Sequence, residues 1–218
     1  MNFITFLYHE ITNSPLETGG QNIGSKDYKT NVSVFGTHLE LFKNKFSTTI
    51  RVDEILKATK DSLMLTFDDG GLSCLDSARS IERAGYRGHF FIVTSFIGLP
   101  GYLSSEDIVS LHNNGHVIGT HSHTHPNIFR DLSLADQKEE WTKSKKILES
   151  LLGTNVICAS IPGGDFNDDT FKSLKMSGIN YVFTSTPDFQ ISYKFGVTII
   201  GRVCPKSDVK FKDISKWI

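Results

Sequence analysis

Short apolar runs alternate with longer amphipathic stretches along most of the chain. The short runs are rich in branched and aromatic residues, and the longer stretches show helical spacing of their apolar positions. We predict strands at residues 3–7, 63–67, 88–93, 116–120, 156–161, 181–184 and 197–203. We predict helices at residues 34–46, 52–59, 73–84, 104–113, 133–152 and 167–176, and a short closing helix within 206–218.

Strands that alternate with helices in this order are typical of a parallel sheet covered by helices. Seven such strands, with no internal repeat or linker, predict a single α/β domain over residues 1–218 whose sheet closes into a barrel. Residues 12–30 are rich in Gly, Asn, Ser and Thr, which is typical of a long surface loop. Chemistry in such barrels lies at the carboxyl ends of the strands.

Composition and charge exclude several classes of protein. The chain is 39% hydrophobic and 22% charged, and its formal net charge of −1 comes without a basic block. We therefore expect no nucleic-acid groove, no polybasic anchor and no membrane span. Three widely spaced cysteines indicate neither a disulfide framework nor a thiolate zinc site. Residues 1–7 lack the basic start of a signal peptide, and we expect a cytoplasmic protein.

Two adjacent carboxylates, Asp68 and Asp69, follow the predicted strand at residues 63–67. Adjacent side chains on an extended chain point to opposite sides, and the glycines at 70 and 71 allow a bend, so the two carboxylates can have different roles. An ordinary Asp-Gly turn is the alternative interpretation of this stretch.

Three of the eight histidines fall within five residues, again after an apolar run. Imidazole is the commonest metal-binding side chain, and a helical turn here would place His121 and His125 on one face. His123 would point elsewhere, and Pro126 would end such a turn early. Two imidazoles and one carboxylate make a metal site with open positions for water and substrate.

These two clusters resemble the motifs of the polysaccharide deacetylases, a family of carbohydrate esterases. Residues 66–70 (TFDDG) match its T-F-D-D-G motif, and residues 121–126 (HSHTHP) match its H-[ST]-x-x-H-P motif. The resemblance implies an irregular (β/α) barrel of seven parallel strands, with the first Asp as general base and the second Asp and both histidines as metal ligands. The corresponding residues here are Asp68 as base and Asp69, His121 and His125 as ligands.

The chain departs from the family at two places. The family's R-x-P-x-G motif begins here with Ser160, so we expect Arg202 to supply the charge that orients the base, with a surface arginine as the alternative. The resemblance assigns the oxyanion contact to the backbone amide of Gly163. No histidine follows His125, so the family's terminal acid is absent. His9 is our candidate acid, because the exopolysaccharide deacetylases resemble this chain in having Tyr-His at the end of the first strand.

The resemblance implies a hydrolase that removes an N-acetyl group, in preference to an O-acetyl group, from a sugar or polysaccharide. Its cofactor would be a divalent cation, and we expect zinc. Two alternatives stay open: a glycan-binding protein of the same fold with weak catalysis, and a related amide hydrolase with a non-sugar substrate. The acetylated substrate and the oligomeric state cannot be read from the sequence.

Overall fold

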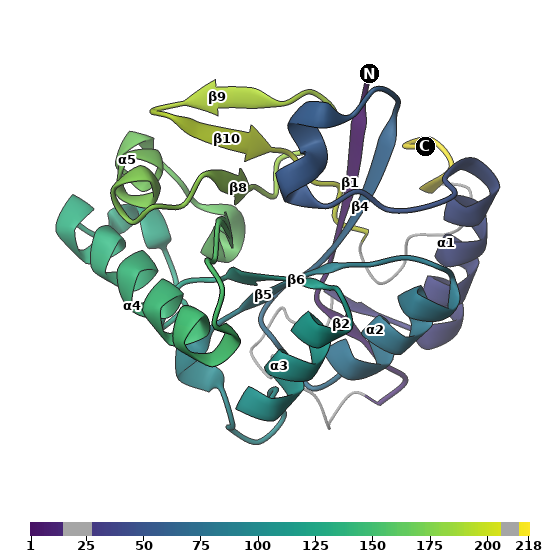
Figure 1. Cartoon of the computed structure of the whole chain (residues 1–218), viewed down its shortest axis with the longest axis horizontal. Coiled ribbons are helices and arrows are strands. Elements are labelled where there is room, and N and C mark those ends of the chain that lie inside the picture. The colour runs from purple at the N-terminus through teal and green to yellow at the C-terminus, as the bar shows by residue number, and fades with distance from the viewer. Residues whose placement is uncertain (15–27, 206–213) are drawn as a thin grey trace.

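Eight strands form one curled sheet, and helices cover its outer side (Figure 1). The strand order is β1-β4-β5-β6-β7-β8-β10-β9, and every neighbouring pair is parallel except β10 and β9. This computed structural model describes residues 1–14, 28–205 and 214–218. The strands are β1 (Phe3–Tyr8), β2 (Glu10–Ile11), β3 (Lys29–Thr30), β4 (Ser62–Phe67), β5 (His89–Ile92), β6 (Val117–Thr120), β7 (Cys158–Ser160), β8 (Tyr181–Phe183), β9 (Ser192–Lys194) and β10 (Val197–Ile200).

The predicted α/β fold with seven parallel strands is confirmed, since β1, β4, β5, β6, β7, β8 and β10 occupy the predicted stretches. Three short strands, β2, β3 and β9, were not predicted. An eighth strand, β9, pairs antiparallel with β10, and β2 pairs with β3 in a separate two-stranded sheet. Most of the predicted loop at 12–30 and of the predicted closing helix lies outside the described residues.

The sheet curls round until its first strand, β1, meets the segment that follows β10. The backbone N–H of Leu7 donates to the carbonyl oxygen of Val203 at 2.8 Å, and the N–H of Val203 donates to that of Thr5 at 2.8 Å. These bonds join β1 to the segment that follows β10. The barrel therefore closes through a short seam, which brings the ends of β4 and β10 to the same region.

Side chains of β4 alternate between the interior of the barrel and its helical coat. Leu63, Leu65 and Phe67 belong to the core cluster that packs under the outer helices, whereas Met64 belongs to the cluster inside the barrel. The period of two places Thr66 on the inner side with Met64. The next side chain on this side, that of Asp68, therefore projects into the barrel at the carboxyl end of β4.

Two of the predicted helix ends show the expected capping residues. Ser104 and Asp107 form a reciprocal capping box, and Gly153 ends its helix in the left-handed conformation with φ of 66°. The stretch predicted as a helix at 52–59 is instead a 3₁₀ helix, Val52–Lys57. The α-helices are α1 (Val32–Lys45), α2 (Cys74–Arg83), α3 (Ser105–Asn113), α4 (Leu134–Leu152) and α5 (Asp168–Met176), and the other 3₁₀ turns are Thr94–Phe96, Phe129–Asp131 and Pro162–Gly164.

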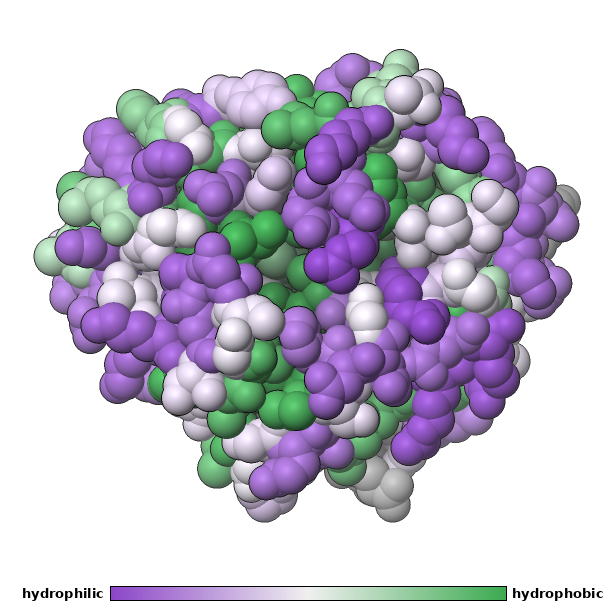
Figure 2. All heavy atoms as spheres, in the orientation of Figure 1, coloured by the Kyte–Doolittle hydropathy of each residue, from purple (hydrophilic) through white to green (hydrophobic). Residues whose placement is uncertain are grey.

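The visible surface is mostly hydrophilic (Figure 2), and the cysteines form no disulfide with one another. Figure 2 shows hydrophilic side chains over much of the visible face, with several hydrophobic ones lying in recesses between them. Within the described ranges, no helix is both long and apolar enough to cross a membrane. All three cysteines are free thiols, so no disulfide framework is present among them.

Candidate active site and metal centre

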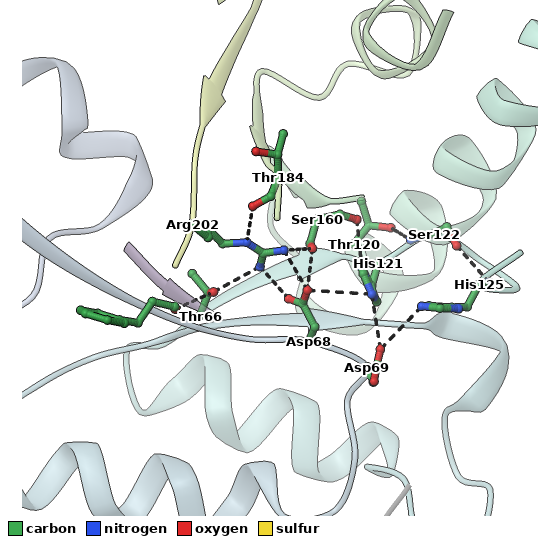
Figure 3. Close-up of polar contacts among 11 residues, drawn as sticks. Thr66, Asp68, Asp69, Thr120, His121, Ser122, His125, Ser160, Thr184 and Arg202 are labelled. Carbon is green, nitrogen blue, oxygen red and sulfur yellow. Dashed lines mark hydrogen bonds and ion pairs between the residues drawn. The ribbon is translucent and has the colours of Figure 1, made fainter. Parts of the chain in front are cut away.

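Asp68 and Asp69 point in different directions at the end of β4: Asp68 faces Arg202 and Ser160, and Asp69 faces the two imidazoles (Figure 3). The N–H of Asp68 donates to the carbonyl oxygen of Tyr8 at 2.9 Å, which continues the ladder with β1 and keeps its side chain on the inner side. Asp69 then adopts a left-handed φ of 74°, and Gly70 follows with the same value. Asp tolerates this conformation better than most residues. The expected separation of the two carboxylates is therefore observed.

His121 and His125 follow β6, but not on a helix. The N–H of His121 continues the ladder by donating to the carbonyl oxygen of Ile92 at 2.9 Å. The chain then turns through left-handed residues, with φ of 64° at Ser122 and 54° at His125. The helical turn considered from the sequence is not formed, because these two conformations produce an irregular loop. His123 points away, as expected, and its Nδ1 atom lies 2.9 Å from the Thr94 hydroxyl.

Asp69, His121 and His125 converge on one point. The Oδ1 atom of Asp69 lies 3.3 Å from Nε2 of His121 and 3.7 Å from Nε2 of His125, and the three ligand atoms lie within 4.8 Å of one another. The side chain of His121 is only 2% exposed, whereas those of Asp69 and His125 are 25% and 31% exposed. The cluster is therefore anchored from the inside and open on one side.

This donor set fits a divalent cation. Ligand atoms bonded at about 2.1 Å in a tetrahedral site lie roughly 3.4 Å apart, close to the two separations from Asp69. The Nδ1 atom of His121 donates to the carbonyl oxygen of Ser160 at 2.9 Å, because a carbonyl can only accept. That bond fixes the ring orientation and leaves the Nε2 lone pair free for a metal.

Asp68 forms a buried ion pair with Arg202. The Nη1 and Nη2 atoms of Arg202 donate to Oδ1 and Oδ2 of Asp68, each at 2.9 Å. The hydroxyl of Ser160 accepts from Nη2 at 2.8 Å and donates to Oδ2 of Asp68 at 2.8 Å. The remaining two donors of the guanidinium reach the hydroxyl of Thr66 and the carbonyl oxygen of Thr184. All five N–H groups of this fully buried side chain are therefore satisfied.

These contacts set the charges of the site. Burial raises the pKa of the Asp68 carboxyl, but the charge and hydrogen bonds of Arg202 and the nearby imidazoles together hold the pKa below its ordinary value. Burial also raises the pKa of Asp69, but its close contact with His121 and the charges of the neighbouring imidazoles bring it far below its ordinary value. Both carboxylates are therefore ionised at neutral pH, and their charge favours a cation between Asp69 and the imidazoles.

The structure places the two remaining candidates next to the same end of the sheet. His9 lies between β1 and β2, and its charge is among the causes that lower the pKa of Asp68 and Asp69. Its ring lies 5.0 Å from that of Tyr28, and its Nδ1 atom has no hydrogen-bond partner among the described residues. Gly163 lies in the turn directly after β7, with a left-handed φ of 62°.

Three polar contacts of the site were missed from the sequence. Ser160 appeared only as a departure from the motif, yet its hydroxyl links both charged partners of the buried pair. Thr66 and Thr184 contribute a hydroxyl and a carbonyl oxygen, and no sequence signal distinguishes these roles from ordinary strand positions.

Comparisons with known proteins agree with this arrangement. The family model for polysaccharide deacetylases matches residues 56–182, more than half of the chain. The chain is 24% identical over 161 residues to the putative polysaccharide deacetylase YxkH of Bacillus subtilis, covering 70% of this chain and 57% of that protein. It therefore spans little more than half the length of that relative.

Two further relatives cover more of the chain. The poly-β-1,6-N-acetyl-D-glucosamine N-deacetylase of Staphylococcus epidermidis is 26% identical over 218 residues, covering 88% of this chain and 73% of that protein. A polysaccharide deacetylase of Bacillus cereus has a similar crystal structure, with a TM-score of 0.85 and 20% identity, covering 100% of this chain and 69% of that chain. The fold, the two motifs and the family match agree, and the chain belongs to the polysaccharide deacetylase family.

Proposed function

We propose that this protein is a metal-dependent deacetylase that hydrolyses the N-acetyl group of an acetylated glucosamine polymer. The observation that carries the proposal is the convergence of Asp69, His121 and His125 beside a second, ionised carboxylate, Asp68. Two simpler interpretations explain only part of this arrangement. A purely structural ion-pair network does not require three possible metal ligands that are open to solvent on one side. A metal site without catalysis does not require a buried, ionised carboxylate beside it.

Asp69, His121 and His125 would hold the cation, which we propose to be zinc. When bound, it supplies a Lewis acid that polarises the acetyl carbonyl and acidifies a water molecule. The Ser160 carbonyl keeps the His121 ring in the orientation that this requires. The partial exposure of Asp69 and His125 supports access for water and substrate.

Asp68 is the proposed general base. Its Oδ2 atom lies 4.0 Å from the Nε2 atom of His121, so the carboxylate borders the proposed cation without belonging to the ligand set. Three hydrogen bonds from Arg202 and Ser160 occupy three of its roughly four acceptor positions, which leaves one for a proton. Arg202 keeps the group ionised and oriented, as a base must be before it takes a proton from water.

The remaining steps are assigned to Gly163 and His9. The reaction consumes one water and releases acetate and a free amine. We assign stabilisation of the tetrahedral oxyanion to the backbone N–H of Gly163, which lies in the turn after β7. We assign protonation of the departing nitrogen to His9, which lies close enough to influence both aspartates electrostatically.

The substrate class is proposed from the relatives. The Staphylococcus epidermidis protein is described as an N-deacetylase of poly-β-1,6-N-acetyl-D-glucosamine, and its match extends over most of this chain. We therefore propose a β-linked N-acetylglucosamine polymer as substrate, in preference to a small acetamido sugar or a non-sugar amide.

Released acetate tests the proposal directly. Zinc-loaded protein is incubated with β-1,6- and β-1,4-linked N-acetylglucosamine oligomers, with N-acetylglucosamine, and with a simple aryl acetamide. We expect acetate from an oligomer, and a loss of at least about a hundredfold in the Asp68→Asn variant. Binding of oligomers without acetate release would favour a glycan-binding protein, and release from the aryl acetamide alone would favour a non-sugar amide hydrolase.

A further inference from the structure

The loop that carries both histidines, residues 121–125, has a strained backbone. Ser122 and His125 have positive φ, and in the described part of the chain the other non-glycine residues with positive φ are Asp69 and Phe195. L-residues rarely adopt this conformation, because Cβ crowds the carbonyl oxygen. Such conformations persist only where surrounding contacts impose them. The contacts that hold this loop therefore decide where its two imidazoles point.

Glu140, on α4, makes three hydrogen bonds to this loop. Its Oε2 atom accepts from the backbone N–H groups of His123 and Thr124, each at 2.8 Å. Its Oε1 atom accepts from the hydroxyl of Thr124, also at 2.8 Å. Hydrogen bonds to an ionised carboxylate are stronger than those between neutral groups. Because both amides lie between the two histidines, the carboxylate holds the middle of the loop.

A second residue of helix α4, Ser144, lies one helical turn after Glu140 and holds the start of the loop. The hydroxyl of Thr120 donates to Oγ of Ser144 at 2.6 Å and accepts from the N–H of Ser122 at 3.1 Å. The hydroxyl of Ser122 in turn accepts from the N–H of His125 at 3.0 Å (Figure 3). Positions 140 and 144 share one face of the helix. Helix α4 therefore fixes the loop at two points, of which only the one at Glu140 carries a charge.

We propose that Glu140 is a positioning residue of the metal centre. Its carboxylate holds residues 121–125 in the strained conformation in which Nε2 of His121 and Nε2 of His125 face Asp69. It acts through the backbone of the loop, since its three bonds go to two amides and one hydroxyl rather than to an imidazole. This inference rests on the proposed function, because it takes these three residues as a metal site.

The test compares zinc affinity in three variants. Glu140→Ala removes all three acceptors, and we expect zinc to bind about 10–100-fold more weakly, the usual effect of losing a group that orients metal ligands. Glu140→Gln can still accept both amides at Oε1 and can donate from Nε2 to the Thr124 hydroxyl, so we expect affinity within about threefold of wild type. Glu139→Ala is the matched control, because Glu139 is the exposed neighbour on the same helix.

Affinity is measured by competition between each protein and a chromogenic chelator for zinc alone. The visible spectrum of the cobalt-loaded protein reports the ligand geometry, and we expect it to change in Glu140→Ala and to stay unchanged in Glu140→Gln. Wild-type affinity in a folded Glu140→Ala variant would overturn the proposal. Equal losses in the Ala and Gln variants would also overturn it, because they would assign the effect to charge rather than to position.

Two further comparisons keep the result decisive. If Glu140→Ala does not fold, Thr124→Ala removes one of the three bonds from an exposed side chain, and we expect a smaller but measurable loss of zinc affinity. Wild-type affinity in that variant would count against the proposal. Zinc binding is read without substrate, so failure of acetate release would refute the proposed function while leaving the role of Glu140 tested separately.

Discussion

The guanidinium of Arg202 donates two hydrogen bonds of 2.9 Å to the carboxylate of Asp68, although 134 positions separate the two residues in the chain. Both side chains are almost completely buried. A charge in such a place is costly unless its partner is present and its remaining bonds are satisfied. The pair therefore links the end of β4 to the seam of the barrel and keeps an ionised carboxylate beside the cluster of Asp69, His121 and His125.

Removing the guanidinium should destabilise the fold strongly. Arg202→Met keeps a long apolar side chain but leaves Asp68 buried without its cation, and we expect the free energy of unfolding to fall by about 3–5 kcal/mol. Urea titrations followed by circular dichroism measure this loss. Arg79→Met is the matched control, because Arg79 pairs with Asp76 on the surface, and we expect a change of less than about 0.5 kcal/mol. Similar small losses in both variants would refute the structural role of the buried pair.

A side chain at Gly71 should not be tolerated. An added Cβ would lie 1.9 Å from Oε1 of Glu10, whose side chain is buried, so Gly71→Ala must displace one of them. We expect a loss of about 1–3 kcal/mol in the free energy of unfolding. Gly36→Ala, inside α1, meets nothing within 4 Å and should stabilise the protein by about 0.5–1 kcal/mol. Thermal melts of the two variants should therefore shift in opposite directions, and a shared direction would contradict the assigned contacts.

Stability should fall in mild acid because of His89. Burial lowers the pKa of His89 from 6.5 to about 4, and its Nε2 atom accepts a hydrogen bond from the N–H of Val52 at 3.1 Å. Above pH 6.5 the ring is neutral in both states and has no effect. Between pH 6.5 and about 4 the unfolded chain binds a proton that the folded protein excludes, so folding is penalised.

The size of this effect can be measured by comparison with His89→Gln. For wild type we expect this group to remove about 2 kcal/mol from the free energy of unfolding between pH 7.5 and pH 5. The His89→Gln variant should lose less over the same interval, because the titrating group is gone. Identical pH dependence in the two proteins, from urea titrations at each pH, would show that His89 does not titrate as described.

Much of the fold could be predicted because its strands are buried on both faces. The residues of β1 and β4 form nearly continuous apolar runs, and parallel strands place their carboxyl ends together, so Asp69 and His121 could be expected to meet. Strand β9 could not be found in this way. All three of its residues are exposed, and it pairs at the edge of the sheet without an apolar pattern.

Contacts between residues that are far apart in the chain could not be predicted from the sequence. Arg202 could be named only as a candidate, with a surface arginine as the alternative, because nothing in the local sequence indicates that its side chain lies inside the barrel. Glu140 lies among other charged residues on α4 and reads as part of a solvated helix face. The irregular loop at 121–125 could not be predicted either, because its left-handed positions are occupied by Ser122 and His125 rather than by glycine, the residue that usually marks such a turn.

The most direct test of the central claim is an anomalous-scattering map, at the zinc edge, from crystals of the protein grown with zinc. We expect one strong peak within about 2.0–2.2 Å of Oδ1 of Asp69, Nε2 of His121 and Nε2 of His125. Asp68 should remain paired with Arg202 and should not coordinate the ion. A peak at another place, or an empty map at these three atoms, would contradict the metal centre and the deacetylase mechanism built on it.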